Sequence, residues 1–126
     1  MTGDGSFQMQ NELATVAGHN LPIKIILFNN QGHAMCRQTQ REWFHEKYES
    51  TSIGGGLTFP RSFRDVVGAY GLYADSISMN LQIPEGLRIT LEGNEPRFLE
   101  VQIDPFHDVV PKLFATKPIE DLQPYL

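Results

Sequence analysis

The stretch from Gly3 to Asn30 constrains the fold more than any other part of this chain. It begins with the tetrapeptide GDGS, passes through an amphipathic segment over 7–20, and continues into a nearly unbroken apolar run over 23–28 that two asparagines close. Ser6 is a favourable N-cap residue, so the amphipathic segment is predicted to be one helix. The apolar run is typical of a strand covered on both faces of a sheet.

The turn before this helix and the end of this strand are predicted to meet. A strand, a crossover helix and a parallel strand connect in a right-handed sense, so both strand ends lie at one edge of the sheet. Asp4 and Asn30 would converge there, beside a helix N-terminus that favours phosphate. Mg²⁺ prefers oxygen ligands, usually one or two carboxylates together with substrate phosphates. The pattern therefore predicts a magnesium diphosphate site, to which a carbonyl near Gly32 adds a ligand.

These motifs resemble those of the thiamine-diphosphate enzymes that use pyruvate, and of acetolactate-synthase-like chains in particular. The resemblance rests on GDGS followed by NN, and on the segments LPIKIILFNNQGHAMCRQTQREWF, GGGLTFPRSFRDVVGAYG, EPRFLEVQIDP and PIEDLQPYL. It covers nearly the whole chain and implies one pyrophosphate-binding domain over 1–126, with a proline-rich tail over 104–126. The implied fold is α/β: a three-layer, open, mostly parallel sheet with helices on both faces, truncated at its N-terminus.

The resemblance also implies roles for individual residues. The metal ligands would be Asp4, Asn30 and the main-chain carbonyl of Gly32. Thiamine diphosphate would contact a wider set, consisting of Gly3, Asp4, Gly5, Ser6, Asn30, Gly32, His33 and Met35. The glutamate that activates the cofactor lies in this family on a pyrimidine-binding domain of another subunit, so no catalytic residue is assigned here. A homo- or hetero-oligomer is implied, and FAD would belong only to a part of the enzyme outside this chain.

Two departures from the family pattern stand out. Between Gly5 and Asn29 lie 23 residues, one fewer than the family's usual minimum, and the gap falls within 8–11. One residue rotates a helix by about 100°, so the first helical turn is expected to wind or cap differently. Only Met1 and Thr2 precede the GDG motif, so the strand that should carry its acid is expected to be missing.

The segment over 35–40 is where the resemblance places substrate selection. Met35 matches a methionine near the reactive centre of the cofactor. Thr39 replaces a tryptophan that shapes the acceptor pocket of acetolactate synthases, and Cys36 replaces a catalytic glutamate of pyruvate decarboxylases. Met35, Cys36 and Thr39 are therefore candidates for the pocket wall. For Cys36 a small buried apolar side chain is the favoured interpretation.

The spacing of apolar residues and the positions of proline and glycine predict the remaining helices and strands. A helix is expected to open at Pro60 and to end at Gly71, because apolar residues repeat there at helical spacing. A short strand over 73–79, a brief helix over 84–91 and a strand over 97–103 follow. The glycine-rich segment 48–58 is predicted to be a loop, and the proline-rich tail is expected to lie extended over a partner domain.

Composition limits the classes of partner and compartment. The net charge of −5 argues against nucleic acid or an anionic membrane as a partner, because both attract basic surfaces. The single cysteine excludes an internal disulfide framework and fits a reducing cytoplasm. No apolar run approaches the length of a membrane span.

Together these features predict part of an enzyme that decarboxylates a pyruvate-like 2-keto acid and transfers the product to an acceptor, using thiamine diphosphate and Mg²⁺. The chain would be incomplete without a pyrimidine-binding domain or subunit. Two alternatives stay open: a non-catalytic remnant or binding module of the same fold, and part of a simple 2-keto acid decarboxylase.

Overall fold

The computed structural model describes residues 1–9, 11–113 and 117–121. These residues form four strands and five α-helices, with short 3₁₀ turns at Ile53–Gly55, Asn80–Gln82 and Ile119–Asp121. In chain order the main elements are β1 Thr2–Gly3, α1 Asp4–Phe7, α2 Leu13–Gly18, β2 Lys24–Asn29, α3 Ala34–Trp43, α4 Phe63–Ala69, β3 Tyr73–Ile77, α5 Ile83–Leu91 and β4 Arg97–Gln102.

The strands form one open sheet in the order β1-β2-β4-β3, and every neighbouring pair is parallel. β2 and β4 are the central strands, and they pair over their full lengths from Lys24 with Arg97 to Asn29 with Gln102. Where no strand was expected before Asp4, the two residues of β1 pair with β2. The predicted open parallel α/β sheet is confirmed.

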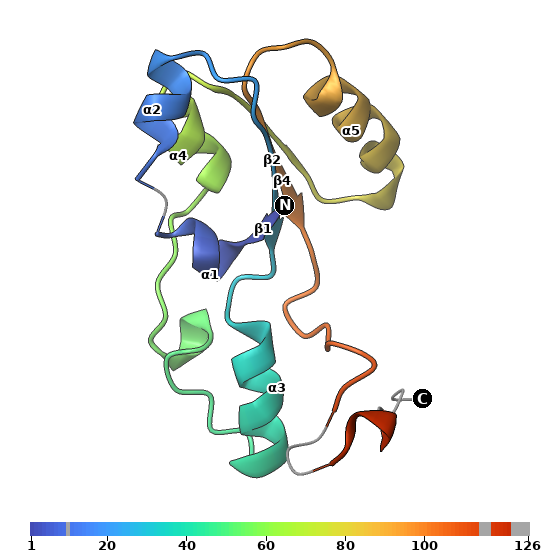
Figure 1. Ribbon diagram of the computed structural model, residues 1–126. Coiled ribbons are helices and arrows are strands. Elements are labelled where there is room, and N and C mark those ends of the chain that lie inside the picture. Colours follow the sequence, from blue (N-terminus) through green and yellow to red (C-terminus); the bar gives the residue numbers. More distant parts are fainter. Residues whose placement is uncertain (10, 114–116, 122–126) are drawn as a thin grey trace.

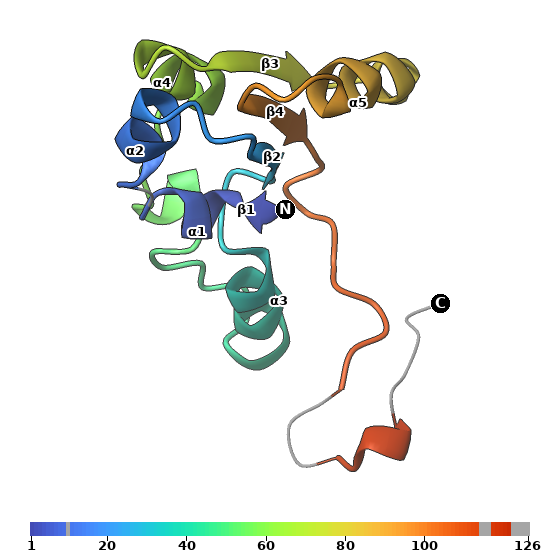
Figure 2. The same cartoon turned by 45° about the horizontal axis from the view of Figure 1, so that its top comes forward.

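Helices cover both faces of this sheet, which gives three layers (Figure 1, Figure 2). α1, α2 and α4 lie on one face, and α5 lies on the other. The first face holds the main core, which consists of Phe7, Leu13, Val16, Leu27, Phe63, Val67, Leu72 and Phe98. On the second face, α5 approaches the strands at Gly86, where an added Cβ would lie 3.1 Å from Ile77 Cγ2. The central strands contribute side chains to both layers: Leu27 and Phe98 belong to the main core, and Leu99 lies against α5 at Gly86.

The amphipathic segment after Gly5 differs from the prediction of one long helix. α1 is a single turn that ends at Phe7, and α2 begins at Leu13. Ser6 lies inside the first turn and makes no cap; Gly3 stands before that turn. Phe7 and Leu13 are both buried, so the break lets each short helix turn its apolar side to the core. The break falls where the spacing between the two motifs is shortened.

The later elements follow the sequence pattern more closely. α4 begins at Phe63 rather than at Pro60, because Ser62 caps it by accepting a hydrogen bond from Asp65 N at 3.1 Å. β3, α5 and β4 form where strands and a helix were predicted, each within two residues of the expected ends. Within the described residues, no helix is both long and apolar enough to cross a lipid bilayer.

Candidate functional site

The carboxylate of Asp4 lies at the centre of the predicted site. It is 3% exposed, and α1 begins at this residue, directly after the β1 edge strand. Its Oδ1 accepts a hydrogen bond from Gly5 N at 2.7 Å, and its Oδ2 accepts one from Gly32 N at 3.0 Å. The crossover from β1 to β2 therefore brings the acid into direct contact with the turn after β2, as the sequence predicted.

Three oxygen-bearing groups converge at this point. A terminal atom of the Asn30 side-chain amide lies 2.6 Å from the Gly32 carbonyl oxygen and 3.1 Å from Asp4 Oδ2. With nitrogen at that position, Asn30 donates hydrogen bonds to both oxygens. With oxygen there, the amide oxygen faces the Gly32 carbonyl oxygen and Asp4 Oδ2, and a cation bound by all three oxygens would stabilise that arrangement. Neighbouring ligands of octahedral Mg²⁺ lie about 3.0 Å apart, since its bonds to oxygen are about 2.1 Å long. The donor set fits such an ion.

Gly32 holds this turn close to the rest of the protein. A Cβ at this position would lie 2.5 Å from the Thr51 carbonyl oxygen and 3.1 Å from Arg37 Nη1. The same Thr51 oxygen accepts a hydrogen bond from His33 N at 2.9 Å. The turn is thus clamped between the loop at Thr51 and the start of α3, which requires a residue without a side chain at Gly32.

The remaining predicted cofactor contacts divide into two groups. His33 packs over the GDG motif, because a Cβ at Gly5 would lie 2.6 Å from two atoms of its ring. Gly3 and Ser6 are exposed beside it. The long helix whose N-terminus was expected to face phosphate is only one turn here, and its Gly5 N–H already bonds to Asp4. The macrodipole at this point is therefore weaker than predicted.

Ionisable side chains alone do not make a metal centre anywhere in the described part of the chain. It contains no cluster of three or more His, Cys, Asp or Glu residues suited to a metal ion. A cation beside Asp4 would thus depend on the neutral oxygens of Asn30 and Gly32, with a phosphate ligand completing its shell. This is the usual arrangement for Mg²⁺, which is held by few protein charges.

The predicted pocket-wall residues lie on one side of α3. Met35, Cys36 and Thr39 line a groove of about 650 Å³ together with Val109 and Leu113 of the C-terminal segment. The interpretation of Cys36 as a small buried side chain is wrong, because the thiol is exposed in this groove. Met35 is also exposed, at 67%. The three predicted residues thus face the C-terminal segment across an open groove.

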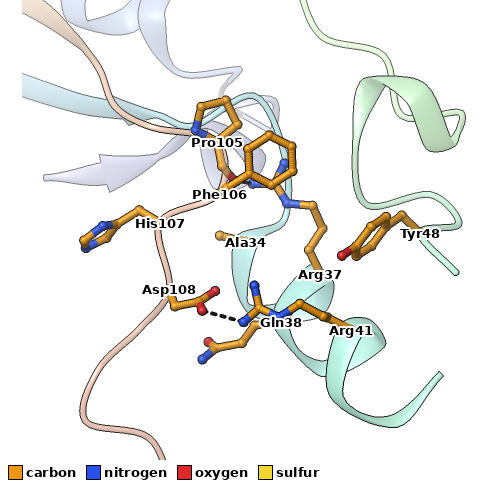
Figure 3. Close-up of a pocket in the computed structure, with 9 residues that line it drawn as sticks. All are labelled: Ala34, Arg37, Gln38, Arg41, Tyr48, Pro105, Phe106, His107 and Asp108. Atoms are coloured by element: carbon orange, nitrogen blue, oxygen red, sulfur yellow. Dashed lines mark hydrogen bonds and ion pairs between the residues drawn. The ribbon is translucent and has the colours of Figure 1, made fainter. Parts of the chain in front are cut away.

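The start of the tail is tied to α3 within this chain. Figure 3 shows Arg41 paired with Asp108, and Phe106 beside the guanidinium of Arg37, which also donates to the Pro105 carbonyl oxygen. The hydrogen bond from Arg41 to Asp108 raises the pKa of the guanidinium. The cavity between these groups is about 10 Å³, the size of one water molecule. These contacts hold the start of the tail against α3.

One buried acid escaped the sequence prediction. Glu100 of β4 is 1% exposed, and it accepts a hydrogen bond from Asn29 Nδ2 at 2.6 Å. The only local signal is a glutamate flanked by apolar residues, Leu99 and Val101, within a strand. A charged residue at a buried strand position needs partners, but the sequence does not identify them.

Comparison with known proteins gives consistent matches. Residues 1–101 match the family described as thiamine pyrophosphate enzyme, C-terminal TPP binding domain. Acetolactate synthase isozyme 2 large subunit of Escherichia coli (strain K12) is 37% identical over 112 residues, which is 88% of this chain and 20% of that protein. The acetolactate synthase large subunit of Lactococcus lactis subsp. lactis (strain IL1403) is 35% identical over 114 residues, or 90% and 19%. That of Pyropia yezoensis is 32% identical over 104 residues, or 82% and 17%. The chain thus spans at most about a fifth of these relatives.

Proposed function

Because this chain belongs to the thiamine pyrophosphate enzyme family, as the C-terminal TPP-binding domain, we propose that it holds the diphosphate end of the cofactor through a Mg²⁺ ion. The ion would be bound by the Asp4 carboxylate, the Asn30 side-chain oxygen and the Gly32 carbonyl. Gly5 and His33 would lie against the same end of the cofactor. The observation that carries this proposal is the convergence of those three oxygen-bearing groups at 2.6 and 3.1 Å.

The charge balance of the site supports a metal bridge rather than direct phosphate binding. Asp4 is buried and already accepts two backbone hydrogen bonds. A diphosphate placed directly against this carboxylate would be repelled, whereas a divalent cation between them neutralises both groups. The amide of Asn30 would then turn its oxygen toward the ion. Coordination of the ion would replace the hydrogen bonds that the amide nitrogen donates to the Gly32 carbonyl oxygen and to Asp4.

We propose that the reaction is of the acetolactate-synthase type, since the relatives above carry that name. The bound cofactor supplies the electron sink for decarboxylating a 2-keto acid. The residues of this chain would bind and orient it, and Met35, Cys36 and Thr39 would form part of the substrate wall. The activating acid would come from a pyrimidine-binding domain or subunit, so the chain alone would not turn over. Pyruvate consumption by the chain alone, with Mg²⁺ and thiamine diphosphate, would contradict this division of labour.

Calorimetric titration of thiamine diphosphate into the full chain tests the cofactor proposal. With a pyrimidine-binding domain of an acetolactate synthase present, we expect binding that requires Mg²⁺ and is lost in Asp4→Asn and Asn30→Ala. Asp65→Asn is the matched control, because it removes the same charge from an exposed residue of α4. Binding that is independent of Mg²⁺, or that survives Asp4→Asn, would refute the metal bridge.

A non-catalytic binding module of the same fold is the second candidate. The observation that favours it is the break between α1 and α2, which leaves only one helical turn beside the proposed diphosphate position. In that case the titration would show no cofactor binding under any of these conditions.

A further inference from the structure

Glu100 lies in the middle of the sheet, beneath the proposed metal site. Its neighbours in register are Leu27 of β2 and Ser76 of β3, and its side chain is 1% exposed. Transferring a carboxylate from water to such a position is costly unless its oxygens are hydrogen-bonded. An apolar residue would fill the same place in the strand without that cost, so the contacts of this acid need an explanation.

Three N–H donors converge on the two carboxylate oxygens. Oε1 accepts hydrogen bonds from Asn29 Nδ2 at 2.6 Å and from Gln102 Nε2 at 2.8 Å. Oε2 accepts one from the backbone N–H of Arg64 at 3.1 Å, in the first turn of α4. Among the described residues, Glu100 forms no ion pair with an arginine or lysine side chain. Its partners are thus the end of β2, the end of β4 and the start of α4.

Asn29 connects Glu100 to the turn that carries the proposed metal ligands. While its Nδ2 donates to Glu100, its Oδ1 accepts a hydrogen bond from Gln31 N at 2.9 Å. Gln31 has φ +56°, in the left-handed region that a non-glycine residue adopts only when its surroundings hold it there. Asn30 and Gly32 stand on either side of Gln31. A side chain fixed at both ends therefore sets the backbone path of this turn.

We propose that Glu100 is a positioning residue for the metal-binding turn: through Asn29 it holds the Asn30 side chain and the Gly32 carbonyl toward Asp4. Glu100 itself has no contact with the proposed ion. This inference rests on the proposed function, because it concerns the geometry of the same site. Groups that orient metal ligands in this way typically contribute 10- to 100-fold to metal affinity.

A purely structural role makes a different prediction. The bond from Arg64 N to Glu100 also stabilises the start of α4, so any variant of Glu100 is expected to lower the stability of the fold. If stabilising the fold were the only role of Glu100, a variant that lowers the stability by the same amount at another core position would raise the Mg²⁺ requirement by the same factor. Val67→Ala is the matched comparison, because Val67 is fully buried in α4 and belongs to the main core away from the turn.

The test measures the Mg²⁺ concentration that gives half-maximal thiamine diphosphate binding. Each variant is mixed with the same pyrimidine-binding domain that is used in the titration of the original chain. Urea unfolding of each variant is measured in parallel. Glu100→Gln removes the negative charge and replaces one acceptor oxygen with an NH₂ donor. The hydrogen bond from Asn29 is therefore weakened or lost, and we expect the Mg²⁺ requirement to rise about tenfold or more. Val67→Ala is expected to lose stability while its Mg²⁺ requirement stays within about twofold. Equal Mg²⁺ requirements for the two variants at equal loss of stability would overturn the proposal.

A reciprocal exchange adds a readout that a structural role would not move. In the double variant Asn29→Asp with Glu100→Gln, the amide at position 100 can donate to the new carboxylate, which still accepts from Gln31 N. Net charge is unchanged, so we expect the Mg²⁺ requirement to return to within about threefold of the original. No recovery in a folded double variant would count against the proposal.

Two further measurements distinguish failure of the Glu100 proposal from failure to fold and from failure of the proposed function. If Glu100→Gln does not fold, Asn29→Ala breaks the same connection while leaving Glu100 its bonds to Arg64 N and Gln102, and it is expected to raise the Mg²⁺ requirement similarly. An unchanged requirement in folded Asn29→Ala would overturn the inference. If the original chain binds with Mg²⁺ and Asp4→Asn does not, the proposed function stands whatever Glu100 does. If Asp4→Asn binds normally, both proposals fail together.

Discussion

Gly32→Ala tests whether the turn beside Asp4 is as tightly clamped as the structure indicates. The added Cβ would lie 2.5 Å from the Thr51 carbonyl oxygen, 0.9 Å short of the 3.4 Å at which ordinary contact begins. The obstacle is backbone rather than a flexible side chain. The Thr51 oxygen also accepts a hydrogen bond from His33 N at 2.9 Å, so it cannot retreat without losing that bond.

These two effects set the expected magnitude. Overpacking of this kind costs about 1–3 kcal/mol, and loss of the hydrogen bond adds about 0.5–1.5 kcal/mol. We therefore expect Gly32→Ala to lower the free energy of unfolding by about 2–4 kcal/mol, a large part of the roughly 5–15 kcal/mol of a typical domain. For a domain of this size that corresponds to a fall in Tm of roughly 6–15 °C.

Urea unfolding followed by circular dichroism measures this change, and Gly68→Ala is the matched control. Gly68 lies in α4, and a Cβ there would meet no atom within 4 Å. Replacing a helical glycine with alanine raises the free energy of unfolding by about 0.5–1 kcal/mol. Gly68→Ala should therefore stabilise the protein, whereas Gly32→Ala should destabilise it. If the free energy of unfolding of Gly32→Ala lies within about 0.5 kcal/mol of the original value, Gly32 does not approach Thr51 as closely as the structure indicates.

Three further predictions concern single side chains. Ser62→Ala removes the α4 cap and is expected to cost about 1 kcal/mol in urea unfolding; no loss would contradict the cap. Cys36 is exposed, so a thiol reagent should modify it in the native state at a rate near that of a free thiol. A labelling rate limited by unfolding would show that the thiol is not exposed in the groove. Arg64, and then Ser62, lower the pKa of Asp65 by hydrogen bonding. Its contribution to stability is therefore present above its ordinary pKa and is lost as pH falls through the lowered one. Asp65→Asn should flatten the acid side of the pH–stability curve, and an unchanged curve would contradict the pairing.

Local patterns predicted most of the framework. The apolar run that became β2 was identified because burial on both faces leaves a continuous apolar signature. The strand predicted over 97–103 from its apolar residues became β4, over 97–102. The meeting of Asp4 with the turn after Asn29 followed from the fixed hand of the crossover. By contrast, the break between α1 and α2 was missed, because apolar spacing over 7–20 is compatible with one helix or two.

Other features depended on contacts that no local pattern encodes. No local pattern indicated that Arg37 and Arg41 would hold the start of the tail against α3 within the chain. Cys36 was interpreted as buried, because small apolar residues usually are, but α3 buries the arginine next to it instead. Which side of a helix faces inward is decided by the surface it meets.

The sequence by itself determined the parallel α/β framework and the pairing of an acid with an asparagine at one sheet edge. Both follow from short-range patterns and the right-handed chirality of the chain. Only the tertiary structure decided what lies beneath that edge, since Glu100 meets Asn29 across 71 residues and Arg64 across 36. A buried carboxylate is stabilised by whichever donors the fold brings to it, and those donors are set by packing rather than by neighbours in sequence.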